Sequence, residues 1–312
     1  MKKRLLFTGG GGSASQSIFE QWSDRYELFF ADASEDSFPP SIPINRRFRI
    51  PFANDKAFLT SLHEICISLK IDLLIPSVDE ELVQLSNMHG VHGWPQILVP
   101  DMEFVSLMLD KKRCAEAIVA SGLAAPRTLP LFRGSEIGFP LIAKPRIGRG
   151  SRGVMKLDNS EQIASYLALH GGDGDDYIAQ ELAVGDEYTC LVAADRSGCL
   201  RAVIPVHAFE KRGVTIRART NCCPAVVEYI KEFQALFKPT GVYNIQCVLT
   251  NDQRVLPFEV NPRISTTFVL GIATGFDPVS MVFSDPESQD LFIPSSQFSL
   301  QRSWHTHIES LA

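Results

Sequence analysis

Apolar and polar positions alternate regularly over the first hundred residues of the chain. Short apolar runs that predict buried strands occur at 4–7, 26–32, 72–77 and 96–100. Segments with apolar residues at helical spacing lie between them, at 13–22, 54–70 and 79–89. Strands that alternate with helices in this way predict a parallel α/β sheet.

The pattern changes near residue 100. A helix is predicted over 101–122, and after Pro126 come strands that helices do not regularly separate. These strands are predicted at 140–146, 153–158, 176–183, 187–195, 200–209, 241–250 and 254–261, with a helix at 224–238. The turn signals DRSG and TNDQ favour hairpins. The fold class is therefore α/β followed by α+β, and the second part is expected to be largely antiparallel.

Composition narrows the class of protein. The 312 residues suffice for about two domains, and a net charge of −6 without a long basic run argues against a nucleic-acid partner. No stretch approaches the roughly 18 apolar residues of a membrane span, and the basic start is too short for a signal peptide. Seven scattered cysteines without a CxxC motif predict reduced thiols in a cytoplasmic protein.

The stretch FTGGGGSASQS at 7–17 is the first candidate for a binding site. The run Gly10–Gly12 supplies two glycines of the dinucleotide motif G-x-G-x-x-G, and Asp32 ends the next strand at the distance of its acidic residue. Ser15 stands where the third glycine belongs, so the match is partial. The glycines can instead make a tight strand–helix turn, or present free amides to an anion at the helix N-terminus, such as a carboxylate substrate.

The strongest chemical signal lies near the end of the last predicted strand pair. Glu259 and Asn261 alternate on one strand, and Gln246 lies on the strand before it. Residues two apart on a strand point the same way, so the three side chains can share one face. Their oxygen atoms suit Mg²⁺, and Arg263 at the strand tip can clamp a phosphoryl group. An incidental exposed strand face is the alternative.

A glycine-rich loop follows the strand that ends at Lys144. Its sequence, IAKPRIGRGSRGV, contains Gly148, Gly150 and Gly153. Such loops can bring backbone amides against phosphates, although a mobile hairpin is the simpler alternative. The pattern G-x-x-x-x-G-K-[ST] is absent, which excludes a P-loop of that type.

The stretch AQELAVGDEYT at 179–189 carries two carboxylates, Glu181 and Glu187. A carboxylate near a ribose can accept hydrogen bonds from both of its hydroxyls, and the main chain at 181–183 can read an adenine edge. The signal is weak when it is taken alone.

In this order and spacing, these stretches resemble the ATP-grasp superfamily, and in particular the synthetase halves of the carbamoyl phosphate synthase large subunit. The resemblance implies a Rossmann-like pre-ATP-grasp domain over 1–100, in which TGGGG and IPSVDEEL are typical phrases. It implies an ATP-grasp domain over 101–285, with a lid at about 124–184. The remaining tail, 286–312, has no assigned role.

The resemblance also assigns roles to individual residues. Lys111 and Lys144 match the basic residues that contact ATP phosphates, and the lid loop supplies Gly148, Gly150, Ser151 and Gly153. Glu181 and Leu182 match the adenine-reading edge, and Glu187 matches the ribose carboxylate. Gln246, Glu259 and Asn261 match the ligands of Mg²⁺, with Mn²⁺ as a substitute. Arg263, together with Lys144, is the implied catalytic residue beside the transferred phosphate.

The expected activity is an ADP-forming ligation of a small carboxylic acid to an amine through an acyl phosphate. The chain has only one synthetase-like unit, and the basic stretch 207–220 only loosely resembles a substrate loop. Lys211, Arg217 and Arg219 in that stretch can bind an acid or form a solvated face. A non-catalytic Mg-ATP-binding protein and a nicotinamide-dependent enzyme are the alternatives. Dimerisation is plausible, although no sequence feature identifies an interface.

Overall fold

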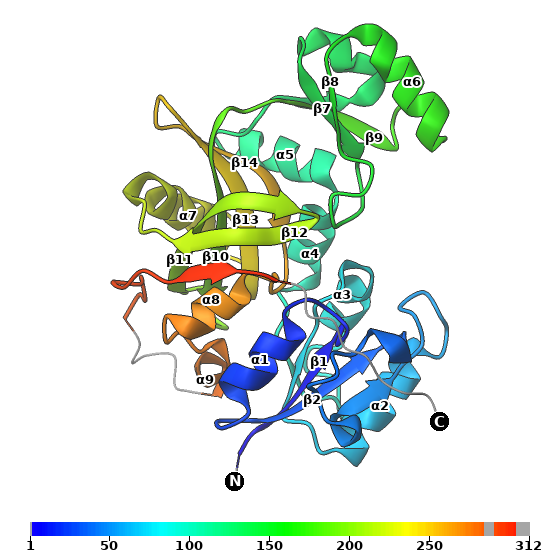
Figure 1. The fold of residues 1–312 in the computed structure, drawn as a ribbon, viewed down its shortest axis with the longest axis vertical. Coiled ribbons are helices and arrows are strands. Elements are labelled where there is room, and N and C mark those ends of the chain that lie inside the picture. The colour runs from blue at the N-terminus through cyan, green and yellow to red at the C-terminus, as the bar shows by residue number, and fades with distance from the viewer. Residues whose placement is uncertain (1, 284–289, 304–312) are drawn as a thin grey trace.

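The computed structural model describes residues 2–283 and 290–303, which form three sheets with helices packed around them (Figure 1). The first sheet is parallel, with strand order β3-β2-β1-β4-β5. Its strands are β1 (Arg4–Thr8), β2 (Glu27–Asp32), β3 (Arg47–Arg49), β4 (Leu73–Ile75) and β5 (Gln96–Ile97). The helices α1 (Ser15–Trp22), α2 (Phe58–Ser68) and α3 (Asp79–Ser86) connect them. The predicted parallel α/β part is confirmed.

The central sheet is antiparallel, with strand order β14-β13-β10-β11-β12-β15. Its strands are β10 (Gly185–Ala194), β11 (Leu200–Arg212), β12 (Val214–Thr220), β13 (Gly241–Thr250), β14 (Val255–Asn261) and β15 (Ser299–Gln301). The helices that pack on it are α4 (Met102–Leu109), α5 (Lys111–Ala120), α7 (Pro224–Phe237), α8 (Phe268–Ala273) and α9 (Pro278–Phe283).

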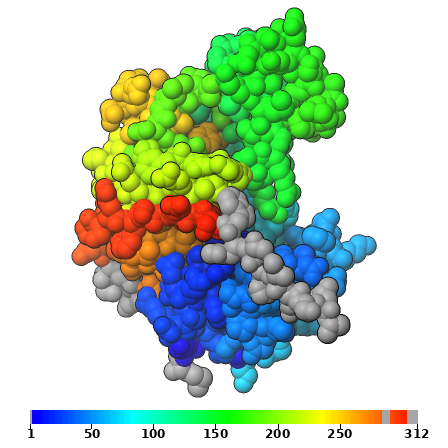
Figure 2. Space-filling view, viewed as in Figure 1, coloured from blue at the N-terminus to red at the C-terminus, as the bar shows by residue number. Residues whose placement is uncertain are grey.

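A small antiparallel sheet stands apart from the other two and projects from the body of the molecule (Figure 2). Its strand order is β6-β9-β7-β8, from β6 (Thr128–Pro130), β7 (Leu141–Pro145), β8 (Met155–Leu157) and β9 (Tyr177–Glu181). Helix α6 (Ser160–His170) packs on it around the buried side chains of Ile163 and Tyr166. Helix α6 was not predicted from the sequence, because its apolar residues do not form one clear face: Ile163 and Tyr166 are buried, whereas Leu169 is exposed.

One hydrophobic core joins the parallel sheet to the central sheet. Phe7 and Trp22 from the first part pack with Phe268 of α8 and Ile204 of β11. The opposite face of the central sheet is covered by α4, α5 and α7, around Phe104, Phe233 and Tyr243. The first of these cores holds the parallel strands against the central sheet.

The predicted helix over 101–122 is wrong in one respect, because it is broken at Asp110. The backbone of Asp110 is extended, and its carboxylate accepts hydrogen bonds from the amides of Lys112 and Arg113. Arg146 pairs with the same carboxylate at 2.6 Å. The new helix start makes Lys111 the first residue of α5, close to the glycine-rich loop.

The tail after residue 285 lies partly outside the described residues. Its described part, 290–303, runs along the central sheet and contains β15, which pairs with β12 from Ser299 to Gln301. Among residues 2–283 and 290–303, no helix is both long enough and apolar enough to cross a membrane.

Candidate active site

Two neighbouring pockets flank the ends of β13 and β14. The small-sheet pocket, about 320 Å³, lies between the small sheet and the central sheet. The parallel-sheet pocket, about 500 Å³, lies between the parallel sheet and the central sheet. Both are lined by the residues Arg149, Ser151, Lys211, Gln246 and Glu259. The two pockets are therefore adjoining parts of one cleft.

The structure gathers most of the predicted site residues in these pockets. The small-sheet pocket is lined by Lys111, Lys144, Gly148, Ser151, Glu181, Leu182, Glu187, Gln246 and Glu259. The parallel-sheet pocket is lined by Gly150, Ser151, Gln246, Glu259, Asn261 and Arg263. Gly153 lines neither pocket and lies against Pro145, where an added Cβ would approach the ring to 3.1 Å. Its place is at the base of the loop.

Strand register explains how the oxygen donors come together. In the β13–β14 pair, Gln246 lies opposite Glu259 and Asn244 lies opposite Asn261. The Nε2 atom of Gln246 donates to Oε2 of Glu259 at 2.9 Å, and Nδ2 of Asn261 donates to Oδ1 of Asn244 at 3.3 Å. Asn244 is fully buried on the same face, and sequence reasoning missed it. Its amide fixes the orientation of the Asn261 side chain.

Lysine side chains surround these oxygens. Lys111 Nζ lies 3.3 Å from Oε1 of Glu259 and donates to the carbonyl of Gly148 at 2.6 Å. Lys211 donates to Oε1 of Gln246 at 2.7 Å and also pairs with Glu187. The sequence places Lys211 only in a basic stretch. The fold brings it into the cleft, because β11 and β12 form a hairpin that turns at Gly213.

Burial and neighbouring charges shift the pKa values of Lys144 and Glu259 at the centre of the cleft. Lys144, only 4% exposed, donates to the carbonyl of Phe258 at 2.9 Å, and burial lowers its pKa to about 8 although Glu259 partly opposes the shift. Burial by itself raises the pKa of Glu259, but the ammonium groups of Lys111 and Lys144 outweigh it and lower the pKa below its usual value. Glu259 is therefore ionised at neutral pH and can attract a cation.

The oxygen donors at the ends of β13 and β14 are of the kind that Mg²⁺ prefers. No cluster of three or more His, Cys, Asp or Glu side chains that could hold a metal occurs in the described part of the chain. One carboxylate, Glu259, and two amide oxygens, of Gln246 and Asn261, are available instead. Mg²⁺ is commonly held by one or two carboxylates together with substrate phosphates, so these residues fit an ion that arrives with a nucleotide.

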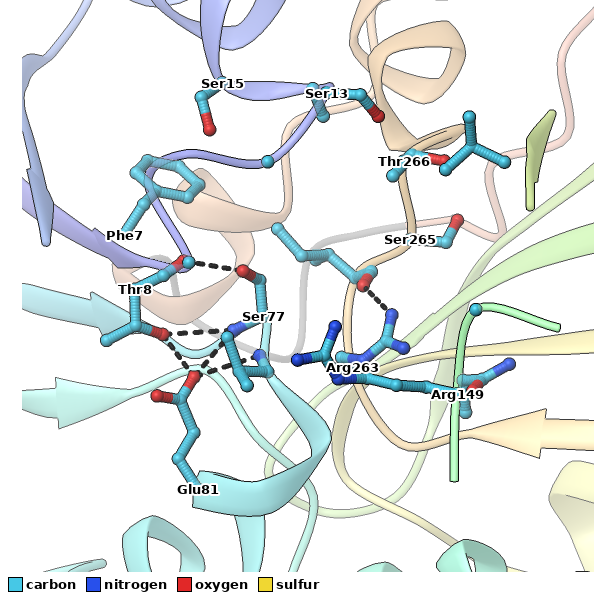
Figure 3. Close-up of a pocket in the computed structure, with 18 of the residues that line it drawn as sticks. Phe7, Thr8, Ser13, Ser15, Ser77, Glu81, Arg149, Arg263, Ser265 and Thr266 are labelled. Carbon is cyan, nitrogen blue, oxygen red and sulfur yellow. Dashed lines mark hydrogen bonds between the residues drawn. The ribbon is translucent and has the colours of Figure 1, made fainter. Parts of the chain in front are cut away.

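Arg263 lies at the tip of β14 and faces the parallel-sheet pocket (Figure 3). Its guanidinium pairs with Asp79 at the start of α3, while Nη1 donates to the carbonyl of Ile264 at 2.9 Å. In the same way, Arg149 of the glycine-rich loop pairs with Glu80 of α3 at 2.9 Å. The phrase IPSVDEEL thus supplies the acidic partners of two cleft arginines, a role that the sequence did not reveal.

The floor of the parallel-sheet pocket contains a buried carboxyl group (Figure 3). Glu81, 2% exposed, accepts hydrogen bonds at Oε1 from the hydroxyl of Thr8 and from the amides of Ser77 and Val78. Burial raises the pKa of Glu81 to about 7 in spite of these bonds. The group ties α3 to the end of β1.

Three amides of the glycine turn are already bonded within the protein. The amide of Gly10 donates to Ala31, that of Gly11 to the Asp32 carboxylate, and that of Gly12 to Gly9. Two of these amides bond to the end of β2 and one bonds within the turn, so these three are not available to a carboxylate substrate. The turn still lines the parallel-sheet pocket through Gly9, Gly12 and the residues 13–15.

The other basic residues of the stretch 207–220 lie elsewhere. Arg217 and Arg219 are exposed on β12 and line neither pocket. The guanidinium of Arg219 lies 5.1 Å from the ring centre of Phe209. The two arginines therefore belong to the solvated face, whereas Lys211 belongs to the cleft.

The family follows from comparison with known proteins. The model of the ATP-grasp domain matches residues 108–267, about half of the chain. The chain belongs to the ATP-grasp family. This match covers β13, β14 and the glycine-rich loop, which together surround the small-sheet pocket.

Curated relatives are much longer than this chain. The carbamoyl phosphate synthase large chain of Kineococcus radiotolerans is 25% identical over 211 residues, which cover 60% of this chain and 19% of that one. The large chain of Pseudomonas syringae pv. tomato is 28% identical over 196 residues, covering 55% and 18%. The chain thus matches about a fifth of the length of these relatives.

Solved structures share the fold at low sequence identity. Carboxyaminoimidazole ribonucleotide synthase from Aspergillus clavatus, complexed with ATP, has a TM-score of 0.66 and 15% identity, covering 84% of this chain and 70% of that one. The L-amino acid ligase from Bacillus licheniformis has a TM-score of 0.65 and 16% identity, covering 86% and 69%. These likenesses establish the ATP-grasp fold.

Proposed function

We propose that the chain is an ATP-dependent, ADP-forming ligase that joins a small carboxylic acid to an amine through an acyl phosphate. The observation that carries the proposal is the shared wall of the two pockets. Gln246 and Glu259 line both of them, so the candidate metal ligands lie between a pocket for a nucleotide and a pocket for a second molecule.

In this proposal the small-sheet pocket takes ATP. Lys111, Lys144 and the loop at 148–153 face the phosphates, while Glu181, Leu182 and Glu187 face the adenosine. Gln246, Glu259 and Asn261 would hold Mg²⁺, which when bound neutralises charge on the phosphate oxygens. The predicted domains, 1–100 and 101–285 with a lid at about 124–184, then meet at the cleft.

The acid occupies the parallel-sheet pocket. An oxygen of its carboxylate attacks the γ-phosphorus of ATP, the bond to the bridging oxygen breaks, and ADP leaves with that electron pair. The amine nitrogen then attacks the acyl carbon of the acyl phosphate and expels phosphate. Arg263 is placed to steady the transferred phosphoryl group, and closure of the glycine-rich loop excludes water that would hydrolyse the intermediate.

The relatives support this chemical class. The neighbours with the same fold include a synthase crystallised with ATP and an L-amino acid ligase. Unpaired thiols at all seven cysteine positions support a reducing, cytoplasmic environment. Pocket chemistry varies freely on one fold, so the acid and the amine are identified by a screen.

The test is a screen of carboxylic acids and amines in pairs, with MgATP present and released phosphate measured. We expect phosphate release only when a matching acid and amine are both present, with one ADP formed for each new amide bond. Tight MgATP binding without turnover in a broad screen would instead identify a nucleotide-binding protein. Binding of NAD(P)H in an equilibrium titration would contradict both assignments.

A further inference from the structure

Arg302 follows β15 and reaches across to three separate segments of the chain. Its Nε donates to the carbonyl of Thr215 at 3.0 Å, Nη1 to that of Ser13 at 2.7 Å and Nη2 to that of Thr266 at 2.5 Å. The acceptors belong to the glycine turn, to β12 and to the segment between β14 and α8. One guanidinium group therefore connects parts of the chain that are far apart in sequence.

All three acceptor residues line the parallel-sheet pocket. Figure 3 shows Ser13 and Thr266 on the opposite side of this pocket from Glu81. The side chains of Ser13, Thr215 and Thr266 are hydroxyl-bearing, and each is carried by the backbone group that Arg302 holds. A change at Arg302 would therefore move three walls of the pocket together, although Arg302 itself is not among the residues that line it.

The chemistry of the contact requires arginine. The planar guanidinium presents its donors in a fixed fork, so it can bond to three carbonyl oxygens at once, whereas a lysine ammonium is a compact charge on a flexible stem. Within the described ranges, no carboxylate oxygen lies within ion-pair distance of Arg302. Its acceptors are neutral, so its positive charge adds to the potential of this pocket wall and favours an anionic occupant.

We propose that Arg302 is a positioning residue for the acid substrate, acting by holding Ser13, Thr215 and Thr266 in one arrangement around the parallel-sheet pocket. The inference rests on the proposed function in that this pocket takes the acid. Arg302 lines no part of the small-sheet pocket, so MgATP binding is independent of it. The C-terminal strand is then part of the substrate side of the enzyme.

The kinetic test compares Arg302→Met with the wild type, using the acid and amine found in the paired screen. We expect the KM for the acid to rise about 10-fold or more, as follows from the loss of charge-assisted hydrogen bonds, with the KM for MgATP unchanged within about twofold. Arg302→Lys keeps the charge without the fork and is expected to behave like Arg302→Met. An equal rise in both KM values, or full activity in Arg302→Lys, would overturn the proposal.

Chemical rescue separates positioning from general loss of structure. In Arg302→Gly, guanidinium chloride at a concentration too low to denature should lower the KM for the acid, and the same concentration of sodium chloride should not. Gln301→Ala is the matched control, because Gln301 is the exposed residue that precedes Arg302 at the end of β15 and its side chain makes none of these contacts. It should match the wild type, and a raised acid KM in Gln301→Ala would overturn the proposal.

A measurement without substrate tests the contact network itself. Hydrogen exchange of backbone amides in Arg302→Met, or in Arg302→Lys if the first variant does not fold, should rise together at 13–15, 214–216 and 265–267. Amides at 142–145 beside the small-sheet pocket should be unchanged. Faster exchange confined to β15 and β12 would contradict the proposal. If the paired screen finds no turnover, the ligase assignment fails, while this measurement still decides whether Arg302 holds the three segments.

Discussion

The two pockets of the cleft are built in different ways. The small-sheet pocket draws its residues from one continuous region, from Lys111 to Glu259, which lies within the match to the ATP-grasp domain. The parallel-sheet pocket combines the glycine turn, the end of β2, the start of α3, the β11–β12 hairpin and the segment after Asn261. The first pocket follows a family motif, whereas the second exists only where distant segments meet.

Under the proposed function, the difference between the pockets places specificity for the acid in the parallel-sheet pocket. The residues for the shared nucleotide chemistry lie on strands whose register fixes them, as with Gln246 opposite Glu259. The residues of the second pocket are held by side-chain contacts between segments, such as Arg263 with Asp79 and Arg302 with three carbonyls. If this pocket takes the acid, as proposed, changes in those contacts would alter which acid it accepts.

The largest effect is expected at the wall that both pockets share. Glu259→Ala removes the only carboxylate among the candidate metal ligands, so phosphate release should fall by about 10³-fold. The measurement is a steady-state phosphate assay with the matching acid and amine. Asp252→Ala, at an exposed turn outside the cleft, is the control and should retain activity. Unchanged turnover in Glu259→Ala would refute the assignment.

A smaller loss of activity is expected for Arg263, which lines the parallel-sheet pocket but not the small-sheet pocket. Arg263→Lys keeps a positive charge but loses the planar fork, so kcat should fall about 10²-fold while MgATP binding stays the same. Calorimetric titration of MgATP into each protein and a kcat measurement give the two values. Weakened MgATP binding of similar size would show that Arg263 acts on the nucleotide pocket instead.

The floor of the parallel-sheet pocket gives a prediction about stability against pH. Burial raises the pKa of Glu81 from 4.5 to about 7. Between these values the unfolded chain has lost the proton that the folded chain keeps, so rising pH destabilises the folded state across this window and has no further effect above it. Glu81→Gln keeps an acceptor oxygen and cannot ionise.

Relative to the wild type, the free energy of unfolding of Glu81→Gln should therefore rise by about 3 kcal/mol as the pH rises through this window. Urea unfolding of both proteins at several pH values checks the sign. A constant difference between them would mean that Glu81 is already ionised in the folded protein at the lower end of the window.

The smallest effect concerns the glycine turn. Gly9 has φ +62°, and an added Cβ would lie 2.5 Å from Oγ of Ser77, which bonds to Thr8. Gly9→Ala should cost about 2 kcal/mol of stability, against about 1 kcal/mol for Gly122→Ala, which has φ +87° but open space around it. Thermal unfolding of the two variants gives the comparison, and equal losses would show that Ser77 moves aside freely.

Gly11→Val is unsuitable as a probe of substrate binding. An added Cβ at Gly11 would lie 2.1 Å from Oγ of Ser37, and the Gly11 amide is already bonded to Asp32. Any rise in the KM for the acid would therefore reflect a disturbed turn. Variants at Arg302 are the better probe of this pocket, because Arg302 bonds to three lining residues without lining the pocket itself.

Much of the fold was predictable from periodicity. The parallel strands β1, β2, β4 and β5 and the strands β10, β11, β13 and β14 lie close to their predicted ranges, because apolar runs of strand character leave few alternatives. The edge strand β3 was not predicted, since it is short and two of its three residues are arginines. The break at Asp110 was missed, although Asp110 is a residue type that caps helices and its carboxylate accepts from the amides of Lys112 and Arg113. Its ion pair with Arg146, far away in sequence, appears only in the tertiary structure. The hairpin strand β12 was missed although its exposed arginines alternate with buried residues, which is the pattern of a half-buried strand.

The sequence by itself determined how the candidate metal ligands are arranged along the chain. Glu259 and Asn261 alternate on β14 and Arg263 follows at its tip, and alternation along a strand is a local property that needs no tertiary information. Only the tertiary structure decided that Lys211 enters the cleft while Arg217 does not, that Asp79 meets Arg263, and that Arg302 joins Ser13 to Thr266. These contacts depend on how separate sheets pack, and packing is a property of the whole chain.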